Sequence, residues 1–136
     1  MLGFLPRQIR VLSDRFSVCQ IASMADVPDE EYVFLARTPD EISLVCRSES
    51  VPESTPVRDD GWRGMLIQGC LDFSLVGILN RILEILALQS ISVFAVSTYN
   101  TDYIFVKGTS LDLAVQALKE EAYDVVFEDF FPHRGY

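Results

Sequence analysis

The sequence predicts an α+β fold in which helices cover one face of an antiparallel sheet, and three observations support this prediction. Two segments show the apolar periodicity of amphipathic helices, and four others have the β-rich character of short strands. The order over residues 62–128 is strand, helix, strand, strand, helix, strand. With 136 residues, of which 49% are hydrophobic, the chain is long enough to bury a core of its own.

The first half of this pattern consists of a strand at residues 62–70 and a helix at residues 75–89. In the helix, Asn80, Arg81 and Glu84 fall on one stripe and apolar residues cover the rest of the surface. So wide an apolar face predicts burial of the helix on two sides.

The second half of the pattern is a hairpin followed by a helix and a closing strand. The predicted elements are a strand at 91–98, a turn at 99–102, a strand at 103–106 and a final strand at 125–128. Thr109 and Asp112 have capping-box spacing, which predicts the start of the second helix. The complete order is that of a ferredoxin-like split β-α-β sandwich.

The region before residue 62 is predicted to contain strands but no long helix. Predicted strands lie at 9–12, 16–21, 32–37 and 42–47, and the Pro-, Ser- and Asp-rich segment 48–61 is predicted to be a loop. At residues 38–41, Thr38 and Glu41 have capping-box spacing, yet β-formers follow. We favour a turn there, with a single helical turn as the alternative. The predicted organisation is a degenerate repeat at 1–60, a complete domain at 61–129 and an aromatic tail at 130–136.

Composition argues against several classes of function. The net charge is −9 and the cations are scattered, so we expect no binding to nucleic acid or to anionic membranes. Cys19, Cys46 and Cys70 each lie in an apolar run, as expected for reduced, buried thiols of a cytoplasmic protein. The single histidine, His133, lies in the tail, and no Cys/His cluster has the spacing of a metal site. We therefore expect neither a cofactor nor catalysis.

Two stretches carry a family resemblance. The helix start FSLVGIL at 73–79 and the segment ISVFAVSTYNTDYI at 91–104 together resemble the ACT domain. Within that family the chain is similar to the tandem-ACT branch of the CASTOR-type arginine sensors, related to the regulatory domain of aspartate kinases, over roughly residues 9–128. The resemblance implies tandem ACT-like units, of which the first is degenerate, a homodimer, and an amino acid ligand bound at an ACT–ACT interface.

A free amino acid is a zwitterion, so its site needs donors for the carboxylate and acceptors for the ammonium group. With Ser74 as N-cap, the amides of the helix start offer donors at the positive end of the helix dipole, and Asp102 offers an acceptor. The candidate ligand-binding residues are Phe73, Ser74, Leu75, Val76, Gly77, Ile78, Ser97, Thr98, Tyr99, Asn100, Thr101 and Asp102.

Structural alternatives remain open for both ends of this site. Gly77 is also explained by close packing of the helix on the sheet, and Asp102 by a bond to its own turn. The alternative function is an interaction module that kept the fold and lost the site. For Phe130 and Phe131 we expect an apolar patch that docks on the first half or on a second subunit.

Overall fold

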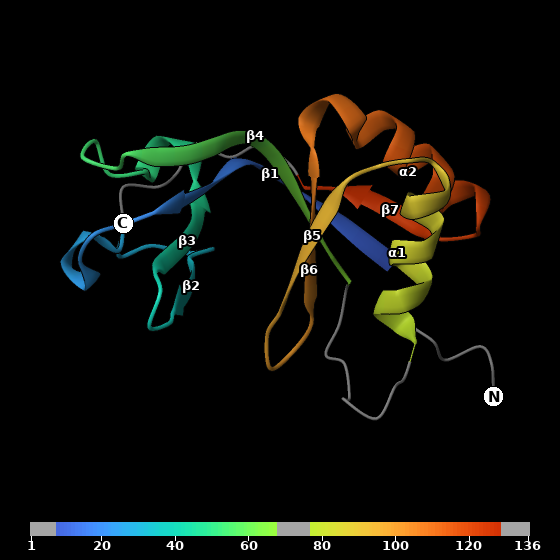
Figure 1. Cartoon of the computed structure of the whole chain (residues 1–136). Coiled ribbons are helices and arrows are strands. Elements are labelled where there is room, and N and C mark those ends of the chain that lie inside the picture. The colour runs from blue at the N-terminus through green and yellow to red at the C-terminus, as the bar shows by residue number, and fades with distance from the viewer. Residues whose placement is uncertain (1–7, 68–76, 129–136) are drawn as a thin grey trace. The chain divides into compact units, whose positions relative to one another are not determined.

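The computed structural model describes residues 8–67 and 77–128, which form two compact units (Figure 1). Among these residues, unit 1 comprises 8–13 and 63–128, and unit 2 comprises 14–62. The strands are β1 (Gln8–Gln20), β2 (Phe34–Arg37), β3 (Ile42–Arg47), β4 (Val57–Ile67), β5 (Val93–Ser97), β6 (Asp102–Lys107) and β7 (Asp124–Phe127). The helices are α1 (Ile78–Leu88) and α2 (Leu111–Glu120), with 3-10 turns η2 (Met24–Asp26), η3 (Ser48–Ser50) and η4 (Gly108–Ser110).

Unit 1 has the predicted order of strand, helix, strand, strand, helix, strand in β4, α1, β5, β6, α2 and β7. Buried apolar residues of α1 and α2 pack on one face of the sheet, where Met65 of β4 and Ile104 of β6 are fully buried. Burial of these alternating strand residues against the helical stripes removes apolar surface from water and supplies the main stabilisation of the unit. The predicted α+β fold, a ferredoxin-like sandwich, is confirmed.

The strand β1 was not predicted in its observed form. Residues 9–12 and 16–21 were expected to be separate strands, but the chain is continuous from Gln8 to Gln20 because the polar residues between them include no Gly or Pro. Gln8 to Val11 pair in parallel with Asp124 to Phe127 of β7, and the order in unit 1 is β7-β1-β4-β6-β5. Unit 1 therefore draws one strand from the beginning of the chain.

The β2–β3 hairpin of unit 2 corresponds to the β5–β6 hairpin of unit 1, and equivalent residues differ by 60 in number. In the β2–β3 pair Phe34 faces Val45, and in the β5–β6 pair Phe94 faces Phe105. The 3-10 turns that follow, Ser48–Ser50 and Gly108–Ser110, are displaced by the same 60 residues. Where unit 1 has long helices, unit 2 has only the short turns η2 and η3.

The turn between β2 and β3 agrees with the interpretation we favoured. The Thr38 amide donates to the Glu41 carbonyl at 2.9 Å, and the Thr38 hydroxyl accepts from the amides of Asp40 and Glu41. No helical turn forms there. The Thr38 hydroxyl thus caps a turn. It accepts from the backbone amides that would also be free at the start of a helix.

Two predicted boundaries were wrong. β4 begins at Val57, so residues 57–61 of the predicted loop 48–61 belong to a strand. Their polar composition had suggested a loop. At α2 the N-cap is Ser110 and makes no side-chain cap bond, so the capping box of Thr109 and Asp112 does not form. Thr109 belongs to the 3-10 turn η4 that precedes the helix, so it lies one residue before the N-cap position.

Unit 2 has a small core and a shielded ion pair. Cys19, Ile21, Leu44, Cys46 and Val51 are buried together on one face of its strands. The Arg47 guanidinium, on β3, is hydrogen-bonded and ion-paired with the Glu30 carboxylate, and both side chains are largely buried. This pair fixes the segment between β1 and β2 to the sheet without the help of a long helix.

Candidate functional site

The start of α1 has a residue with left-handed backbone, Gly77. Gly77 has φ +89° and is the N-cap of the helix, so the prediction that it lies inside the first turn was wrong. Its carbonyl accepts from the Arg81 amide at 2.9 Å, and no side chain caps the helix. Among the described residues, no heavy atom lies within 4 Å of the place where a Cβ would stand, so within them Gly77 is explained by its left-handed backbone. Residues 73–76 of the predicted site lie outside the described residues.

The first turn of α1 offers backbone donors. With Gly77 as N-cap, the amides of Ile78, Leu79 and Asn80 have no acceptor in the preceding turn of the helix. These amides lie at the positive end of the helix dipole, which favours an anionic group. The N-cap is thus Gly77 and not the expected Ser74, which displaces the free amides toward the C-terminus, and Ile78 is the residue of the predicted site that carries one of them.

The hairpin turn at residues 98–101 is held by its own threonines. The Thr98 amide donates to the Thr101 carbonyl at 2.8 Å, and the Thr98 hydroxyl donates to the same carbonyl at 3.0 Å. The buried Thr101 hydroxyl donates to the Ile67 carbonyl at 2.8 Å, which ties the turn to the end of β4. Thr98 and Thr101 thus position the turn, while Tyr99 and Asn100 are exposed at its tip.

Asp102 keeps acceptor capacity for a ligand. The Ser97 hydroxyl donates to its Oδ1 at 2.5 Å across the first residue pair of the hairpin. This bond replaces the expected alternative, in which the carboxylate would bond to the backbone of its own turn. A carboxylate has about four lone-pair positions, so one bond to Ser97 orients the group and leaves Oδ2 able to accept from a cation.

Connectivity brings these two features to the same end of unit 1. α1 is followed by β5, which runs back along the helix and ends at the turn (Figure 1). The start of α1 and the turn between β5 and β6 therefore both lie at the lower end of unit 1 in this view. The amide donors of the helix start and the turn that precedes Asp102 thus lie at the same end of unit 1.

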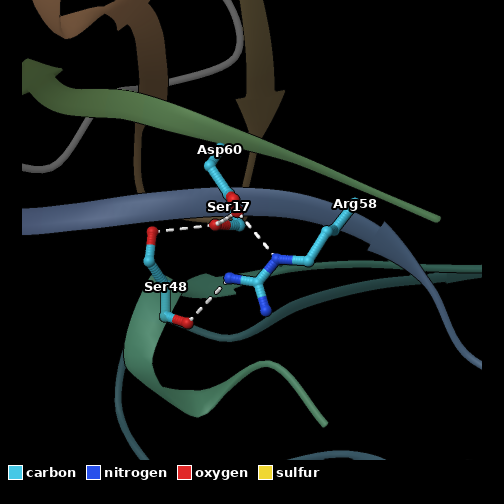
Figure 2. Close-up of polar contacts among 4 residues, drawn as sticks. All are labelled: Ser17, Ser48, Arg58 and Asp60. Atoms are coloured by element: carbon cyan, nitrogen blue, oxygen red, sulfur yellow. Dashed lines mark hydrogen bonds and ion pairs between the residues drawn. The ribbon is translucent and has the colours of Figure 1, made fainter. Parts of the chain in front are cut away.

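A polar cluster in unit 2 was missed by sequence reasoning (Figure 2). The fully buried Ser17 hydroxyl donates to Asp60 Oδ1 at 2.5 Å and lies 2.8 Å from the Ser48 hydroxyl. Since its single proton is used on Asp60, Ser48 must be the donor in the second bond. Arg58 donates to Asp60 Oδ1 at 2.9 Å and to the Ser48 carbonyl at 3.2 Å.

This cluster satisfies its own members and joins β1, η3 and β4. Ser48, Arg58 and Asp60 fall within the predicted loop 48–61, where nothing in the local pattern distinguishes them from solvent-exposed residues. The only available signal was Ser17 at the centre of the apolar strand 16–21.

Cys19 and Cys46 are free, buried thiols, as expected. Burial, followed by the effect of the neighbouring Cys19, raises the pKa of the Cys46 thiol to about 12. Burial also raises the pKa of Cys19. Neither thiol is therefore ionised near neutral pH, and reactivity toward electrophiles is suppressed.

The raised pKa of Cys46 predicts an alkaline loss of stability. Above the ordinary pKa of 9.0 the unfolded chain releases this proton, whereas the folded chain keeps it up to about pH 12. The free energy of unfolding should therefore fall with rising pH, by about 2 kcal/mol at pH 10.5 relative to pH 8 from this group alone. Urea unfolding of the wild type and of Cys46→Val measures it, since valine occupies the matching position, Val106, in the other hairpin. The same dependence of the free energy of unfolding on pH in the two proteins would contradict the prediction.

The family model of the ACT domain matches residues 57–120. Residues 57–120 form an ACT domain. The match spans the candidate site, from the start of α1 through the β5–β6 hairpin, and ends with the last residue of α2. No curated protein matches the chain.

Solved structures share the fold beyond the ACT domain. Protein Atu0741 from Agobacterium tumefaciens has a TM-score of 0.83 at 25% identity, with 96% of this chain and 100% of that chain covered. Protein VC0802 from Vibrio cholerae, of unknown function, has a TM-score of 0.68 at 20% identity, covering 81% and 85%. The regulatory subunit of aspartate kinase from Thermus thermophilus, in its ligand-free form, has a TM-score of 0.59 at 8% identity, covering 82% and 95%.

The described part of the chain has neither a metal-binding cluster nor a membrane-spanning helix. Residues 8–67 and 77–128 contain no cluster of three or more His, Cys, Asp or Glu side chains suited to a metal ion. Within the same ranges no helix has the length and apolarity needed to cross a membrane.

Proposed function

We propose that the protein is a non-catalytic regulatory module that binds a free amino acid at the start of α1 and the β5–β6 turn. The ACT domain at residues 57–120 supports this proposal, as does the similarity in fold to regulatory parts of aspartate kinases. The observation that carries it is the opposite polarity of the two features at one end of unit 1. The helix start favours a carboxylate, and Asp102 favours an ammonium group.

In this proposal the amides of Ile78, Leu79 and Asn80 bind the ligand carboxylate. Gly77 contributes its left-handed backbone. The ammonium group donates to Asp102, whose carboxylate is already oriented by Ser97. Thr98 and Thr101 act by positioning the turn, and the side chain of the ligand extends past the exposed Tyr99 or Asn100.

A thermal-shift series with the twenty amino acids tests the proposal directly. A ligand that binds only the folded chain raises the free energy of unfolding by RT ln(1 + [L]/Kd), about 2.7 kcal/mol at a hundredfold excess over Kd. We expect one amino acid, or one chemical class, to raise the melting temperature by several degrees. If no amino acid shifts the melting temperature at millimolar concentrations, the proposed sensor function is contradicted.

Replacing Asp102 by Asn tests whether this carboxylate binds the ammonium group of the ligand. Loss of the charge should weaken binding of the identified amino acid about tenfold or more, because charge-assisted hydrogen bonds contribute about 1.5–3 kcal/mol. Asp40→Asn is the matched control, since Asp40 is an exposed carboxylate in the equivalent turn of unit 2. Isothermal titration calorimetry of both variants gives the comparison. Equal affinities for the two variants would place the ammonium group elsewhere.

The second candidate function is an interaction module that uses the fold without a ligand. β5 ends the hydrogen-bonded strand order of unit 1, and no charged residue occurs between Glu84 and Asp102, so this uncharged edge strand is the observation that favours it. A null ligand series together with a stoichiometric protein partner would support this second function.

A further inference from the structure

Two cysteine side chains lie together in the core of unit 2. Cys19 on β1 and Cys46 on β3 are free, buried and members of the same apolar cluster. In the antiparallel register of these strands Cys19 faces Leu44 and Cys46 faces Ser17, so the two cysteines are diagonal neighbours on one face of the sheet. Their thiols are hydrogen-bonded to each other, so the two sulfur atoms are already in contact.

The surroundings make the two thiols unequal. Burial is the main cause that raises the pKa of each, and that of Cys46 reaches about 12. The hydrogen bond between them lowers the pKa of Cys19 and raises that of Cys46, which identifies the Cys46 thiol as the donor and Cys19 Sγ as the acceptor. Cys19 is therefore the thiol that ionises first and the better nucleophile of the two.

A fixed cation lies near both thiols. After burial, the charge of Arg58 has the largest effect on the pKa of Cys19, which it lowers, and it also lowers that of Cys46. The carboxylates of Asp60 and Glu30 act in the opposite direction, the first on Cys19 and the second on Cys46. The Arg58 guanidinium is held in place by its bond to Asp60 Oδ1 at 2.9 Å (Figure 2). The polar cluster of unit 2 thus keeps a positive charge beside the pair.

We propose that Cys19 and Cys46 form a reversible redox pair, which a small hydroperoxide oxidises to a disulfide between β1 and β3. In the first step the Cys19 sulfur attacks one oxygen of hydrogen peroxide, the O–O bond breaks, and hydroxide leaves as water with the proton of the thiol. In the second step the Cys46 sulfur attacks Cys19 Sγ, the S–O bond of the sulfenic acid breaks, and the hydroxyl leaves as water with the Cys46 proton. One peroxide and two thiols give one disulfide and two waters, and the sulfurs lose two electrons.

The buried environment favours this product and limits the oxidants that produce it. A site that disfavours a thiolate accommodates a disulfide, because the disulfide carries no charge. Burial makes the first step slow and excludes bulky electrophiles. The second step is intramolecular between sulfur atoms that are already in contact, so it is fast by comparison. The pair therefore responds to a small oxidant during sustained exposure.

Strain makes the disulfide easy to reduce. Diagonal neighbours on adjacent strands are about 7–8 Å apart, whereas a relaxed disulfide spans about 5.5–6 Å between Cα atoms. Oxidation therefore draws β1 and β3 together, and a strained disulfide has a higher reduction potential. Cys46 is followed directly by Arg47 and Ser48 in the chain. Arg47 is paired with Glu30, and Ser48 is hydrogen-bonded to Ser17, so the movement reaches both polar contacts of unit 2.

Intact-mass spectrometry of the full chain with Cys70→Ser tests the disulfide, because Cys19 and Cys46 are then its only thiols. After hydrogen peroxide treatment of the folded chain we expect the loss of two hydrogens, no free thiol on unfolding, and the return of two thiols with dithiothreitol. Proteolysis should give one cross-linked pair of peptides that contains both cysteines. Two intact thiols at the highest peroxide concentration that leaves the chain folded, a gain of oxygen instead, or a link between two copies would overturn the proposal. The test contains no amino acid ligand and is independent of the proposed function.

Two single-thiol variants in the same background test the order of the steps. With Cys46→Val the Cys19 sulfenic acid has no partner, so this chain should gain oxygen and keep its hydrogens. With Cys19→Val the remaining Cys46 thiol should be oxidised at least tenfold more slowly than Cys19 in the other variant, because far less of it is ionised. Equal rates of oxidation in the two variants would overturn the assignment of Cys19 as the attacking thiol.

Arg58→Gln tests the contribution of the nearby cation. Without this charge the pKa of Cys19 should rise, so disulfide formation near neutral pH should slow severalfold and its increase with pH should move to higher pH. Arg37→Gln is the matched control, since Arg37 is an exposed arginine on β2 and its loss changes the net charge equally. Equal rates of disulfide formation for Arg58→Gln and Arg37→Gln would overturn the role of Arg58.

Discussion

Replacing Arg47 by Met should lower the free energy of unfolding by about 3 kcal/mol, because the change leaves the Glu30 carboxylate shielded from water without its partner. The side chains of Arg47 and Glu30 are 11% and 16% exposed, and the guanidinium both hydrogen-bonds and ion-pairs with the carboxylate. Water can replace little of that interaction. Urea unfolding at neutral pH measures the loss.

Two further variants test whether the loss in the free energy of unfolding comes from breaking a buried ion pair or from removing any positive charge. Arg81→Met removes ion pairs with Glu84 and Glu121 in which all side chains are at least 48% exposed, and should cost less than about 1 kcal/mol. The double variant Glu30→Met/Arg47→Met should recover part of the loss, because no unpaired charge remains. Equal losses for Arg47→Met and Arg81→Met would contradict the assignment.

Replacing Leu118 by Ala in α2 should lower the free energy of unfolding by about 3 kcal/mol or more. The side chain is fully buried among the helices and sheet of unit 1, and its removal leaves a cavity in addition to the lost apolar burial. The backbone carbonyl of Leu118 still accepts from the amides of Glu121 and Tyr123, so the end of the helix is preserved.

Leu113→Ala is the control for this prediction. It makes the same substitution in the same helix, where helix propensity changes equally, but its side chain is 45% exposed. Its cost should be about 1 kcal/mol or less. Similar costs for the two variants would mean that Leu118 does not anchor the core of unit 1.

The parts of the fold that follow from local pattern were predictable from the sequence. The apolar stripe of α2, with Leu111, Ala114, Val115 and Leu118 buried, follows from spacing alone. The hairpin of β5 and β6 follows from two β-rich segments around turn residues. A degenerate repeat was predicted at residues 1–60, but the sequence did not show which elements it shares with unit 1, because unit 2 has 3-10 turns where unit 1 has helices.

Features that depend on distant residues were not predictable. The pairing of β1 with β7 leaves no mark on either segment, because each has only the alternation of an ordinary strand. The bond from Ser17 to Asp60 likewise joins residues that are 43 positions apart. At the site, Asp102 was identified by charge, but its orientation by Ser97 depends on the hairpin register. The left-handed backbone of Gly77 was compatible with the sequence but not required by it.

The parallel pairing of β1 with β7 also constrains how the protein is made. Gln8 is synthesised 116 residues before Asp124, which its backbone faces and to which its side chain also donates. The sheet of unit 1 therefore cannot close until Asp124–Phe127 have been synthesised, and β1 remains without this partner until then. Contacts of such long range slow folding through the entropy of closing the loop.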